Sequence, residues 1–304
     1  MSIDTIKIII GFLDWTCDLD TFESTATVLK LTGYEKEQIH EYWKKCTNIN
    51  IDTVTHDLSD SVKITKITVN YKLHCYDKPA LQIITNKKFI HYWYVNDKLH
   101  RSDGPAVEKQ NGHKEWWYHG QRHRTDGPAI EYTSSNQEWY LYGQLHRVDG
   151  PALIKNSKQE WYLNGKLHRI DGPAIEQKNG IKKWYLHGQL HRVDGPAVEY
   201  PDGFDEWWVH GQRHRLDGPA AIEYNRQEWH IHGQLHRTDG PAIEYLNGRK
   251  EWYQNNKLHR LDGPAVEFGD WTEWWKNGRK HRIDGPAISG IYRYNEYWIE
   301  GKQI

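Results

Sequence analysis

The sequence has little of the material from which most hydrophobic cores are built. Its 304 residues include 1 Met and 5 Phe, and only 37% of them are hydrophobic. A deep two-layer core is therefore not expected. The 16 Trp and 19 Tyr must supply much of the apolar area, and the polar atom on each of these rings needs a partner. This composition predicts a thin, extended structure with a large surface.

Cysteines and long apolar runs are scarce too. Cys17, Cys46 and Cys75 are odd in number and lack the spacing of a zinc site, which argues against a disulfide scaffold and favours a reducing compartment. The apolar run over residues 8–13 is too short to cross a membrane and lacks the flanks of a signal peptide. We therefore predict a cytoplasmic protein.

The chain also lacks a strong excess of either charge. The formal net charge is −1, and residues 1–60 carry a net −6 whereas residues 61–304 carry a net +5. A charge of +5 spread along an extended array is not the concentrated basic patch of a nucleic-acid-binding protein. The sequence thus indicates no nucleic-acid partner.

What the chain does contain is a repeat of 22–23 residues. The motif His-Arg-x-Asp-Gly-Pro-Ala occurs nine times, each time seven residues after a Trp. The distance from Trp to Ala is constant, whereas the segment from Ala to the next Trp varies by one residue, which predicts structured units joined by tolerant loops. The motif His residues are His100, His123, His146, His168, His191, His214, His236, His259 and His281.

Less regular copies flank these nine, as expected of a repeat array. His74–Ala80 is a worn copy of the motif, and Glu296–Gly301 begins a further unit. We predict an array over 67–304, with a capping copy near 67–88, full repeats over about 89–290 and a truncated repeat over 291–304. A linker over 51–66 would precede it.

Turn signals within each unit predict β-hairpins. Asn164-Gly165 between two strand-forming stretches is the strongest short hairpin signal, and Asn179-Gly180 supplies a second turn. The expected fold is mainly β: an elongated single-layer antiparallel meander or solenoid of nine to ten hairpin repeats, with two strands per repeat. Gly172-Pro173 cannot continue a regular ladder and predicts a bend.

The two-residue turn also sets a register. Trp161 and His168 would share one face of the sheet, whereas Glu160 and Arg169 would face each other on the opposite side. Equivalent Trp rings lie roughly 10 Å apart, so the His, Pro or Ala of each unit must sit between them. From the tip outward, the predicted pairs are Leu163 with Lys166, Tyr162 with Leu167, Trp161 with His168, and Glu160 with Arg169.

The recurring His and Asp residues are interpreted as structural. Catalysis or metal binding needs such groups to converge in one pocket, whereas here they repeat at constant pitch. We predict no enzymatic activity, no metal and no cofactor, and we expect acid to loosen an array in which neutral His lies beside Trp. The structural residues in two neighbouring copies are Trp161, His168, Arg169, Asp171, Gly172, Pro173, Trp184, His191, Arg192 and Asp194.

The repeats resemble a known family. The segment Trp275-Lys276-Asn277-Gly278-Arg279-Lys280-His281 resembles the Trp-x-Asn-Gly-x-x-His-Gly core of MORN repeats, and other copies over about residues 67–304 are similar. Arg stands in place of the family's second Gly, as in the variant found in giant DNA viruses. The resemblance implies an elongated scaffold, located in the host cytoplasm if the protein is viral, that dimerises end to end and contacts phospholipids. The replaced Gly leaves lipid binding an open alternative.

Residues 1–50 have a different pattern. The apolar spacing between Ile6 and Trp43 predicts two or three short helices. Residues 8–14, followed by Asp18-Leu19, are similar to the start of an F-box. This resemblance implies docking to a Skp1-type adaptor of a ubiquitin ligase, with the array reading the substrate. The alternative is a helical cap over the first edge of the array.

The C-terminal strand predicts a further contact. Tyr297, Trp298 and Ile299 would form an unpaired aromatic edge, and such edges invite pairing. We expect self-association, as a homodimer, through these residues. The function predicted for the whole chain is a non-enzymatic protein–protein interaction scaffold. The alternatives are an F-box-type adaptor and a phospholipid- or glycan-binding module, since aromatic hairpins also resemble choline-binding repeats.

Overall fold

The computed structural model describes residues 51–59, 62–85, 88–291 and 293–304. They fall into two compact units, one ending at His146 and including Ala152–Lys155, the other comprising Arg147–Pro151 and Asn156–Ile304. All regular elements in these residues are strands, paired antiparallel. This confirms the prediction of a mainly β structure made of repeated hairpins. The predicted helical domain over 1–50 lies outside the described residues.

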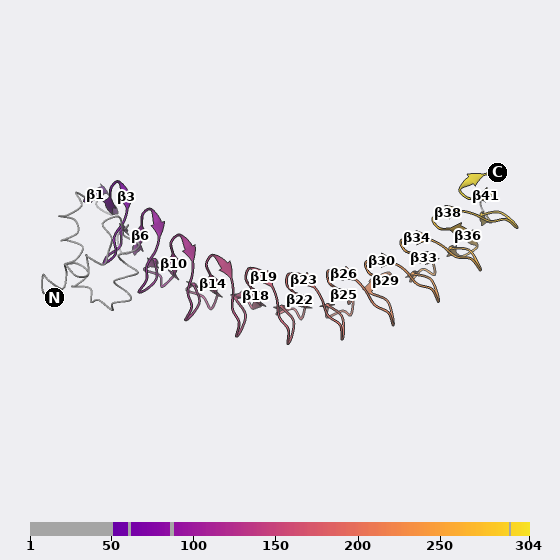
Figure 1. The fold of residues 1–304 in the computed structure, drawn as a ribbon, viewed down its shortest axis with the longest axis horizontal. Helices are drawn as coiled ribbons and strands as arrows, with labels where there is room; N and C mark the ends of the chain where they lie inside the picture. Colours follow the sequence, from indigo (N-terminus) through magenta and orange to yellow (C-terminus); the bar gives the residue numbers. More distant parts are fainter. Residues whose placement is uncertain (1–50, 60–61, 86–87, 292) are drawn as a thin grey trace, which may run out of the picture. The chain divides into compact units, whose positions relative to one another are not determined.

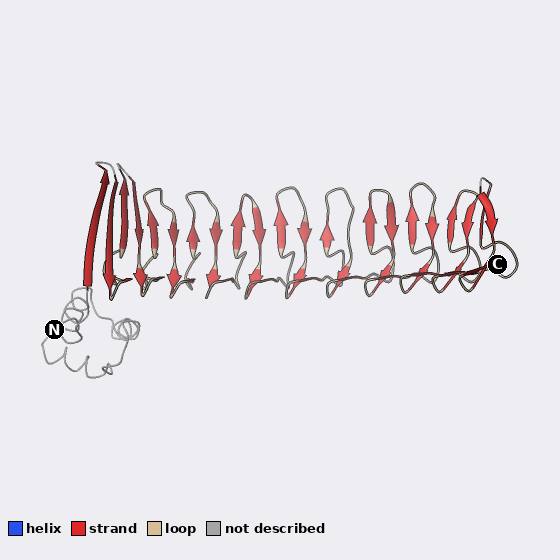
Figure 2. Cartoon of the chain, turned by 90° about the horizontal axis from the view of Figure 1, so that it is seen from above, coloured by secondary structure: helices blue, strands red, loops and turns tan. Residues whose placement is uncertain are grey.

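Each repeat contains two hairpins instead of the single hairpin expected (Figure 1). β20 (Ile175–Gln177) and β21 (Lys182–Lys183) form a hairpin in a long sheet, and β22 (Tyr185–Leu186) and β23 (Gln189–Leu190) form a short separate one. Trp184 divides the two because its N–H donates to the carbonyl of Ala197, 2.8 Å away, outside the hairpin. Figure 2 shows the sheet strands side by side, with the short hairpins at one end of them.

In the first unit, the long sheet grows by one hairpin per repeat. Its strands, in order, are β1 (Ile51–Ser59), β2 (Val62–Val69), β4 (Leu81–Thr85), β5 (Lys88–Tyr92), β8 (Val107–Lys109), β9 (Lys114–Glu115), β12 (Ile130–Glu131), β13 (Gln137–Glu138) and β16 (Leu153–Lys155). The short strands are β3 (Lys72–Leu73), which pairs with β2, and the hairpins β6 (Tyr94–Val95) with β7 (Lys98–Leu99), β10 (Trp117–Tyr118) with β11 (Gln121–Arg122), and β14 (Tyr140–Leu141) with β15 (Gln144–Leu145).

The second unit repeats this plan. Its sheet strands are β17 (Lys158–Glu160), β20, β21, β24 (Val198–Glu199), β27 (Ala221–Glu223), β28 (Arg226–Glu228), β31 (Ile243–Tyr245), β32 (Lys250–Glu251), β35 (Val266–Phe268), β36 (Trp271–Glu273), β39 (Ile288–Gly290) and β40 (Arg293–Glu296), with Glu206 bridging β24 and β27. Its short hairpins, apart from β22–β23, are β18 (Tyr162–Leu163) with β19 (Lys166–Leu167), β25 (Trp208–Val209) with β26 (Gln212–Arg213), β29 (His230–Ile231) with β30 (Gln234–Leu235), β33 (Tyr253–Gln254) with β34 (Lys257–Leu258), β37 (Trp275–Lys276) with β38 (Arg279–Lys280), and β41 (Trp298–Ile299) with β42 (Lys302–Gln303).

The predicted linker over 51–66 is wrong. Residues 51–59 and 62–69 are strands β1 and β2, which pair with each other and open the sheet. Both segments are rich in Val, Ile and Thr, which favour strands. They carry neither the Trp nor the His of the repeat, so the motif gave no sign of them.

The predicted tip of the short hairpin is confirmed. Asn164 and Gly165 have φ of 50° and 73°, as a type I′ turn requires, and Tyr162 pairs with Leu167 as expected. Beyond Trp161 the predicted register is wrong. Glu160 pairs with Ile175 in the long sheet and not with Arg169, because the chain leaves the short hairpin at the Trp.

The two positions that face each other in the short hairpins are correlated along the chain. When the residue after the motif Trp is another Trp, it faces Arg or Lys, whose charged group lies 5.0–5.9 Å from the ring. When it is Tyr or His, it faces Leu. The cationic pairs are Trp117–Arg122, Trp208–Arg213 and Trp275–Lys280. The Leu pairs are Tyr94–Leu99, Tyr140–Leu145, Tyr162–Leu167, Tyr185–Leu190, His230–Leu235 and Tyr253–Leu258.

The core is thin, as the composition predicted. The Ala that ends each motif is fully buried, and it is followed in most repeats by a buried Val or Ile. In the second unit these Ala residues are each 0% exposed: Ala174, Ala197, Ala220, Ala242, Ala265 and Ala287. No larger side chain fits at this position without moving the backbone of its neighbours.

We expect Ala174→Leu to lower the free energy of unfolding by about 1–3 kcal/mol, because the added carbons have no space. Urea unfolding of the full chain measures the change. Ile170→Leu is the matched control: Ile170 is 86% exposed, so its substitution should stay within about 0.5 kcal/mol. Equal unfolding midpoints for the two variants would contradict this description of the core.

Candidate functional site

The motif Arg is the centre of the bend in each repeat. The Arg169 guanidinium carbon lies 4.1 Å from the centre of the Trp161 ring. Its Nε donates to Asp171 Oδ1 at 3.0 Å, and its Nη1 donates to the Pro173 carbonyl at 3.2 Å and to Glu176 Oε1 at 2.8 Å. The predicted bend at Gly-Pro is therefore present and is held by Arg169, which faces Glu176 and not the Glu160 that was expected.

The next copy has the same arrangement. Arg192 lies 4.0 Å over Trp184 and donates to Asp194 at 3.1 Å and to Glu199 at 2.6 Å. The group on the Trp ring is thus the motif Arg, and not the His, Pro or Ala that the sequence suggested. The pKa of Asp194 is lowered, chiefly by the hydrogen bond from Arg192.

Gly172 is required by close approach and not by backbone conformation. A Cβ on Gly172 would lie 2.9 Å from the Arg169 guanidinium carbon, nearer than real contacts allow. The equivalent glycine of the next copy, Gly195, has the same neighbour distance to Arg192. The Gly of the motif therefore leaves room for the cation.

The motif His residues join each repeat to the next. The backbone N–H of His187 donates to His168 Nδ1 at 3.1 Å, and that of His210 donates to His191 Nδ1 at 3.2 Å. The two rings of each pair have centroids 4.4 Å apart. An accepting Nδ1 requires a neutral ring. Burial and the neighbouring His lower the pKa of His168, and the pKa of His191 is lowered by the same two causes.

Seven other copies follow this pattern, whatever residue occupies the tip. The donor residue has φ of 47–50°, which is strained for a side chain other than Asn or Gly. The bond to the imidazole offsets part of that strain. The remaining pairs are Asn96 with His74, His119 with His100, Tyr142 with His123, His232 with His214, Asn255 with His236, Asn277 with His259, and Glu300 with His281.

A carboxylate before the motif Trp satisfies the polar tips of the rings. These Glu residues bind the side chain two positions later, on the far side of the Trp at which the chain passes from the long sheet to the short hairpin. Burial, followed by the neighbouring Glu251, raises the pKa of Tyr253 to about 12. At 2.8–3.1 Å the pairs are Glu115–Trp117, Glu138–Tyr140, Glu160–Tyr162, Glu206–Trp208, Glu228–His230, Glu251–Tyr253, Glu273–Trp275 and Glu296–Trp298.

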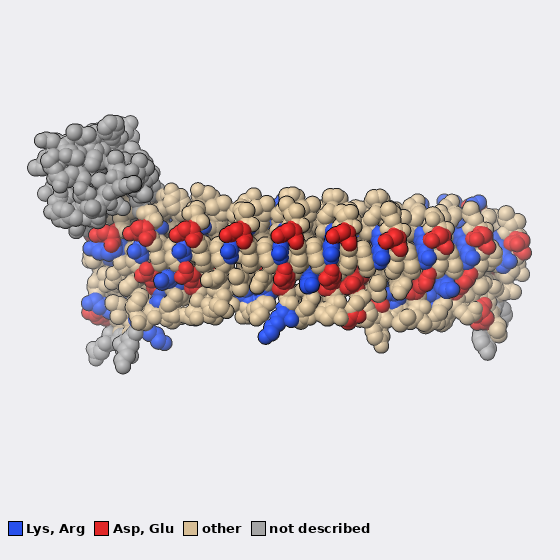
Figure 3. All heavy atoms as spheres, turned by 90° about the horizontal axis from the view of Figure 1, so that it is seen from below, with Lys and Arg blue, Asp and Glu red and all other residues tan. Residues whose placement is uncertain are grey.

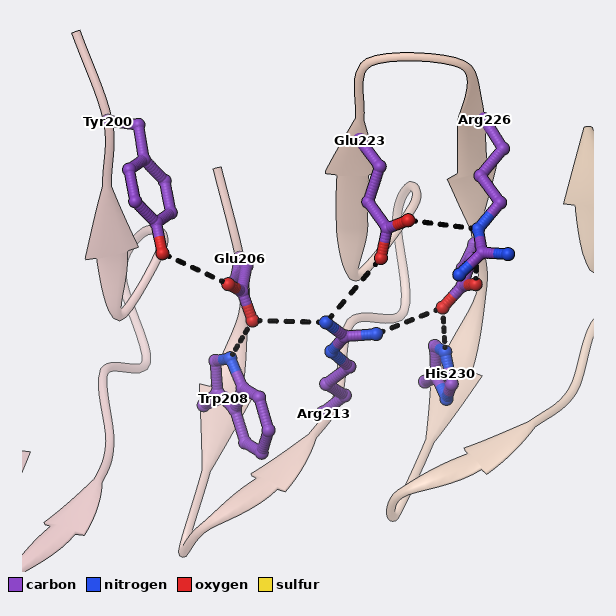
Figure 4. A network of polar contacts seen from close by, with 8 residues as sticks. Tyr200, Glu206, Trp208, Arg213, Glu223, Arg226 and His230 are labelled. Atoms are coloured by element: carbon purple, nitrogen blue, oxygen red, sulfur yellow. Dashed lines mark hydrogen bonds and ion pairs between the residues drawn. The ribbon is translucent and has the colours of Figure 1, made fainter. Parts of the chain in front are cut away.

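Two of these carboxylates are linked into one network (Figure 4). Arg213 lies between them and donates to Glu206 at 3.3 Å and to Glu228 at 3.0 Å. His230 and Arg226 also contact Glu228, each at 2.9 Å. The hydrogen bond with His230 is the largest of the effects that lower the pKa of Glu228. The network joins neighbouring hairpins around the buried Glu228, whose charge is compensated by Arg213 and Arg226.

The bends present two neighbouring side chains to solvent, the variable residue of the motif and the Asp that follows it. The variable position of the motif, between Arg and Asp, is 73–86% exposed in the second unit wherever it is aliphatic. A hollow of about 570 Å³ separates the bend at Ile170 from the bend at Val193, so each bend stands out as a ridge. We call these side chains the aliphatic stripe: Val148, Ile170, Val193, Leu216, Leu261 and Ile283.

The C-terminal strand differs from the prediction. Trp298 and Ile299 pair with Gln303 and Lys302 in the last short hairpin. On its other side the Trp298 carbonyl accepts the N–H of Arg282 at 3.0 Å. The open edge of this hairpin therefore lies at residues 302–304. Self-association through residues 297–299 stays a prediction.

Comparisons with known proteins do not assign the chain to a family. No family model and no curated protein matches the chain. Within the described residues there is no cluster of three or more metal-ligating side chains. The same part of the chain has no helix of the length and apolar character needed to cross a bilayer.

Sequence reasoning brought together the right residues but missed three of their contacts. It found the motif Trp, His, Arg, Asp, Gly and Pro, and the predicted pairing of Trp161 with His168 is confirmed by the His168 N–H, which donates to the Trp161 carbonyl at 3.0 Å. It placed Arg on the wrong face, however, and missed the bond from His187 to His168. The i, i+2 pairing of Glu with the next aromatic residue could have been found, because Glu-Trp-Tyr and Glu-Trp-Trp recur in the repeats. The aliphatic stripe could also have been found, since it is the one variable position within the motif.

The close contact of Gly172 with Arg169 predicts strong coupling between them. Gly172→Ala should cost about 1–3 kcal/mol in the native background, because the new Cβ displaces the guanidinium from Trp161. In an Arg169→Ala background the same change should be neutral or stabilising, since Gly172 does not need positive φ. A double-mutant cycle by urea unfolding measures this. Additive effects would refute the role assigned to Gly172.

The lowered pKa of four motif His residues predicts sensitivity to acid: they are His123, His168, His191 and His214, and burial is the first cause in each. The unfolded chain binds more protons than the folded one below about pH 6.5, so stability falls as the pH drops through the folded-state pKa. The melting temperature of the full chain should therefore be lower at about pH 5.5 than at about pH 7.5. An unchanged value would overturn the neutral-His interpretation.

His187→Asn should reduce this dependence on pH. It removes the ring that lowers the pKa of His168 but keeps a residue that tolerates the turn, as Asn277 does in a later repeat. His56→Asn is the control, because it removes an exposed His outside the repeats. The two variants should differ in the slope of melting temperature against pH.

Proposed function

We propose that this protein is a non-enzymatic scaffold that binds other proteins through the bends of its repeats, in the cytoplasm. The MORN-like repeat, and its variant in giant DNA viruses, form part of this proposal. The observation that carries it is the aliphatic stripe, since its side chains are among the most exposed apolar groups of the second unit.

The stripe differs between the two units. In the first unit the same position of the motif is Ser102 or Thr125, both exposed and polar. In the second unit it is aliphatic at six of seven bends, with Thr238 as the exception. Nothing in the bend requires an apolar residue there, because the position faces solvent. Recurring exposed apolar groups of this kind mark interaction surfaces.

The other recurring groups support a binding role over a chemical one. Arg, Asp, His and Glu of each repeat contact one another or the backbone, at distances typical of hydrogen bonds. A second hollow lies between the bends at Ser102 and Thr125, and the motif Arg, Asp and Trp line it as they line the hollow between Ile170 and Val193. Open hollows that recur in this way suit an extended protein surface better than a small substrate.

Affinity purification from the native cell tests the proposal. Proteins bound by the wild-type chain should be lost with Val193→Glu/Leu216→Glu, which places charge in the stripe. Thr125→Glu, at the equivalent polar position of the first unit, is the matched control and should retain them. Unaltered circular dichroism and melting curves show that the variants are folded. An identical set of partners for all three chains would refute the proposal.

A further inference from the structure

The aliphatic stripe has an internal symmetry. The second unit contains seven bends, and their variable residues are, in order, Val148, Ile170, Val193, Leu216, Thr238, Leu261 and Ile283. Leu216 is the central one, with three bends on each side. The spacing between bends is set by two sheet strands per repeat, which is about 10 Å.

We propose that the stripe is covered by the stripe of a second copy of this chain, running antiparallel, with Leu216 at the two-fold axis. This inference rests on the proposed function and names the partner. In this arrangement Val148 lies against Ile283 of the other copy, Ile170 against Leu261, and Val193 against Thr238. Each of the first two contacts joins two aliphatic side chains, and symmetry makes each of these three contacts occur twice, whereas Leu216 meets its own copy once, at the axis.

The pitch of the repeats favours a second copy over a foreign protein. An interface along the stripe requires apolar groups at about 10 Å intervals over seven positions. A second copy of this chain has the same interval between its bends because it has the same repeats. Another protein would need apolar groups at that interval for a different reason. A register shifted by one repeat leaves one terminal aliphatic residue uncovered, so the register centred on Leu216 buries the most apolar surface.

The charges of the bends are compatible with such a contact. Each stripe residue is followed by an exposed Asp, whose Oδ1 lies 2.9–3.1 Å from the Arg Nε of the same bend. Figure 3 shows acidic and basic side chains recurring side by side along the array. Each exposed Asp is therefore ion-paired with the Arg of its own bend, which offsets its charge where two stripes approach, although in four of the seven bends the same Arg also binds a Glu. The contact is apolar and should persist at high salt.

Sedimentation of the full-length protein at several concentrations tests the inference. The wild-type chain should be a dimer, at low and at high salt. Leu216→Glu places two like charges at the axis, and Ile170→Glu buries a charge against Leu261. Each should raise the dissociation constant at least about tenfold. Thr125→Glu, in the first unit, should leave the dimer unchanged.

A charge exchange tests the register. Ile170→Glu/Leu261→Lys should restore the dimer, because residue 170 of each copy lies against residue 261 of the other. Ile170→Glu/Val193→Lys carries the same charges at positions that do not meet, so it should stay weakened. Restoration by both double variants, or by neither, would overturn the proposed register.

Two outcomes would overturn the self-association while separating it from the proposed function. If the wild-type chain is a monomer, but Val193→Glu/Leu216→Glu still loses its partners, then a foreign protein covers the stripe and the proposed function stands. If a dimer forms and all stripe variants retain it, the contact lies elsewhere, for example at residues 302–304. In that case the affinity purification alone decides the proposed function.

Discussion

The repeats are built around a guanidinium that lies over an indole ring, with its carbon 3.8–4.2 Å from the ring centre. Arg169 reaches Trp161 only because the chain turns back at Asp171, and the same guanidinium holds that turn through the Pro173 carbonyl. The motif Gly lacks a side chain so that the cation can fit. Asp, Gly and Pro of the motif thus all lie against the motif Arg. The variable position x makes none of these contacts and is free to vary.

A second set of contacts turns separate repeats into an array. The N–H of Gly188 donates to the carbonyl of Leu167 at 2.8 Å, next to the bond that His187 makes to His168. Both bonds run from the tip of one short hairpin to the preceding hairpin. Each repeat therefore depends on its immediate neighbours, as in other repeat proteins, and the joint includes an imidazole whose acceptor role requires the neutral form.

In a thin array rich in Trp and Tyr, the indole N–H and Tyr hydroxyl groups also need hydrogen-bond partners. In eight repeats the structure does this by pairing the ring after the motif Trp, or after Tyr297 in the last repeat, with the carboxylate that ends the preceding sheet strand or bridge, as in Glu160–Tyr162. Where this ring is the indole of Trp117, Trp208 or Trp275, the facing residue is a cation, and Arg213, which faces Trp208, also links Glu206 to Glu228. Variation between repeats is therefore coordinated, which explains why the substitutions do not disturb the fold.

The sequence by itself determined the period, the two turns, the pairing of Tyr162 with Leu167 and the bend at Gly172-Pro173, because each depends on residues adjacent along the chain. It did not determine where the strand ends. The Trp161 N–H donates to the carbonyl of Ala174, thirteen residues later, and this bond ends the hairpin and places Arg169 on the ring. Likewise, the partner of His168 lies in the next repeat. Only the packing of whole repeats decided these contacts, because backbone groups and rings distant along the chain meet only after the hairpins stack.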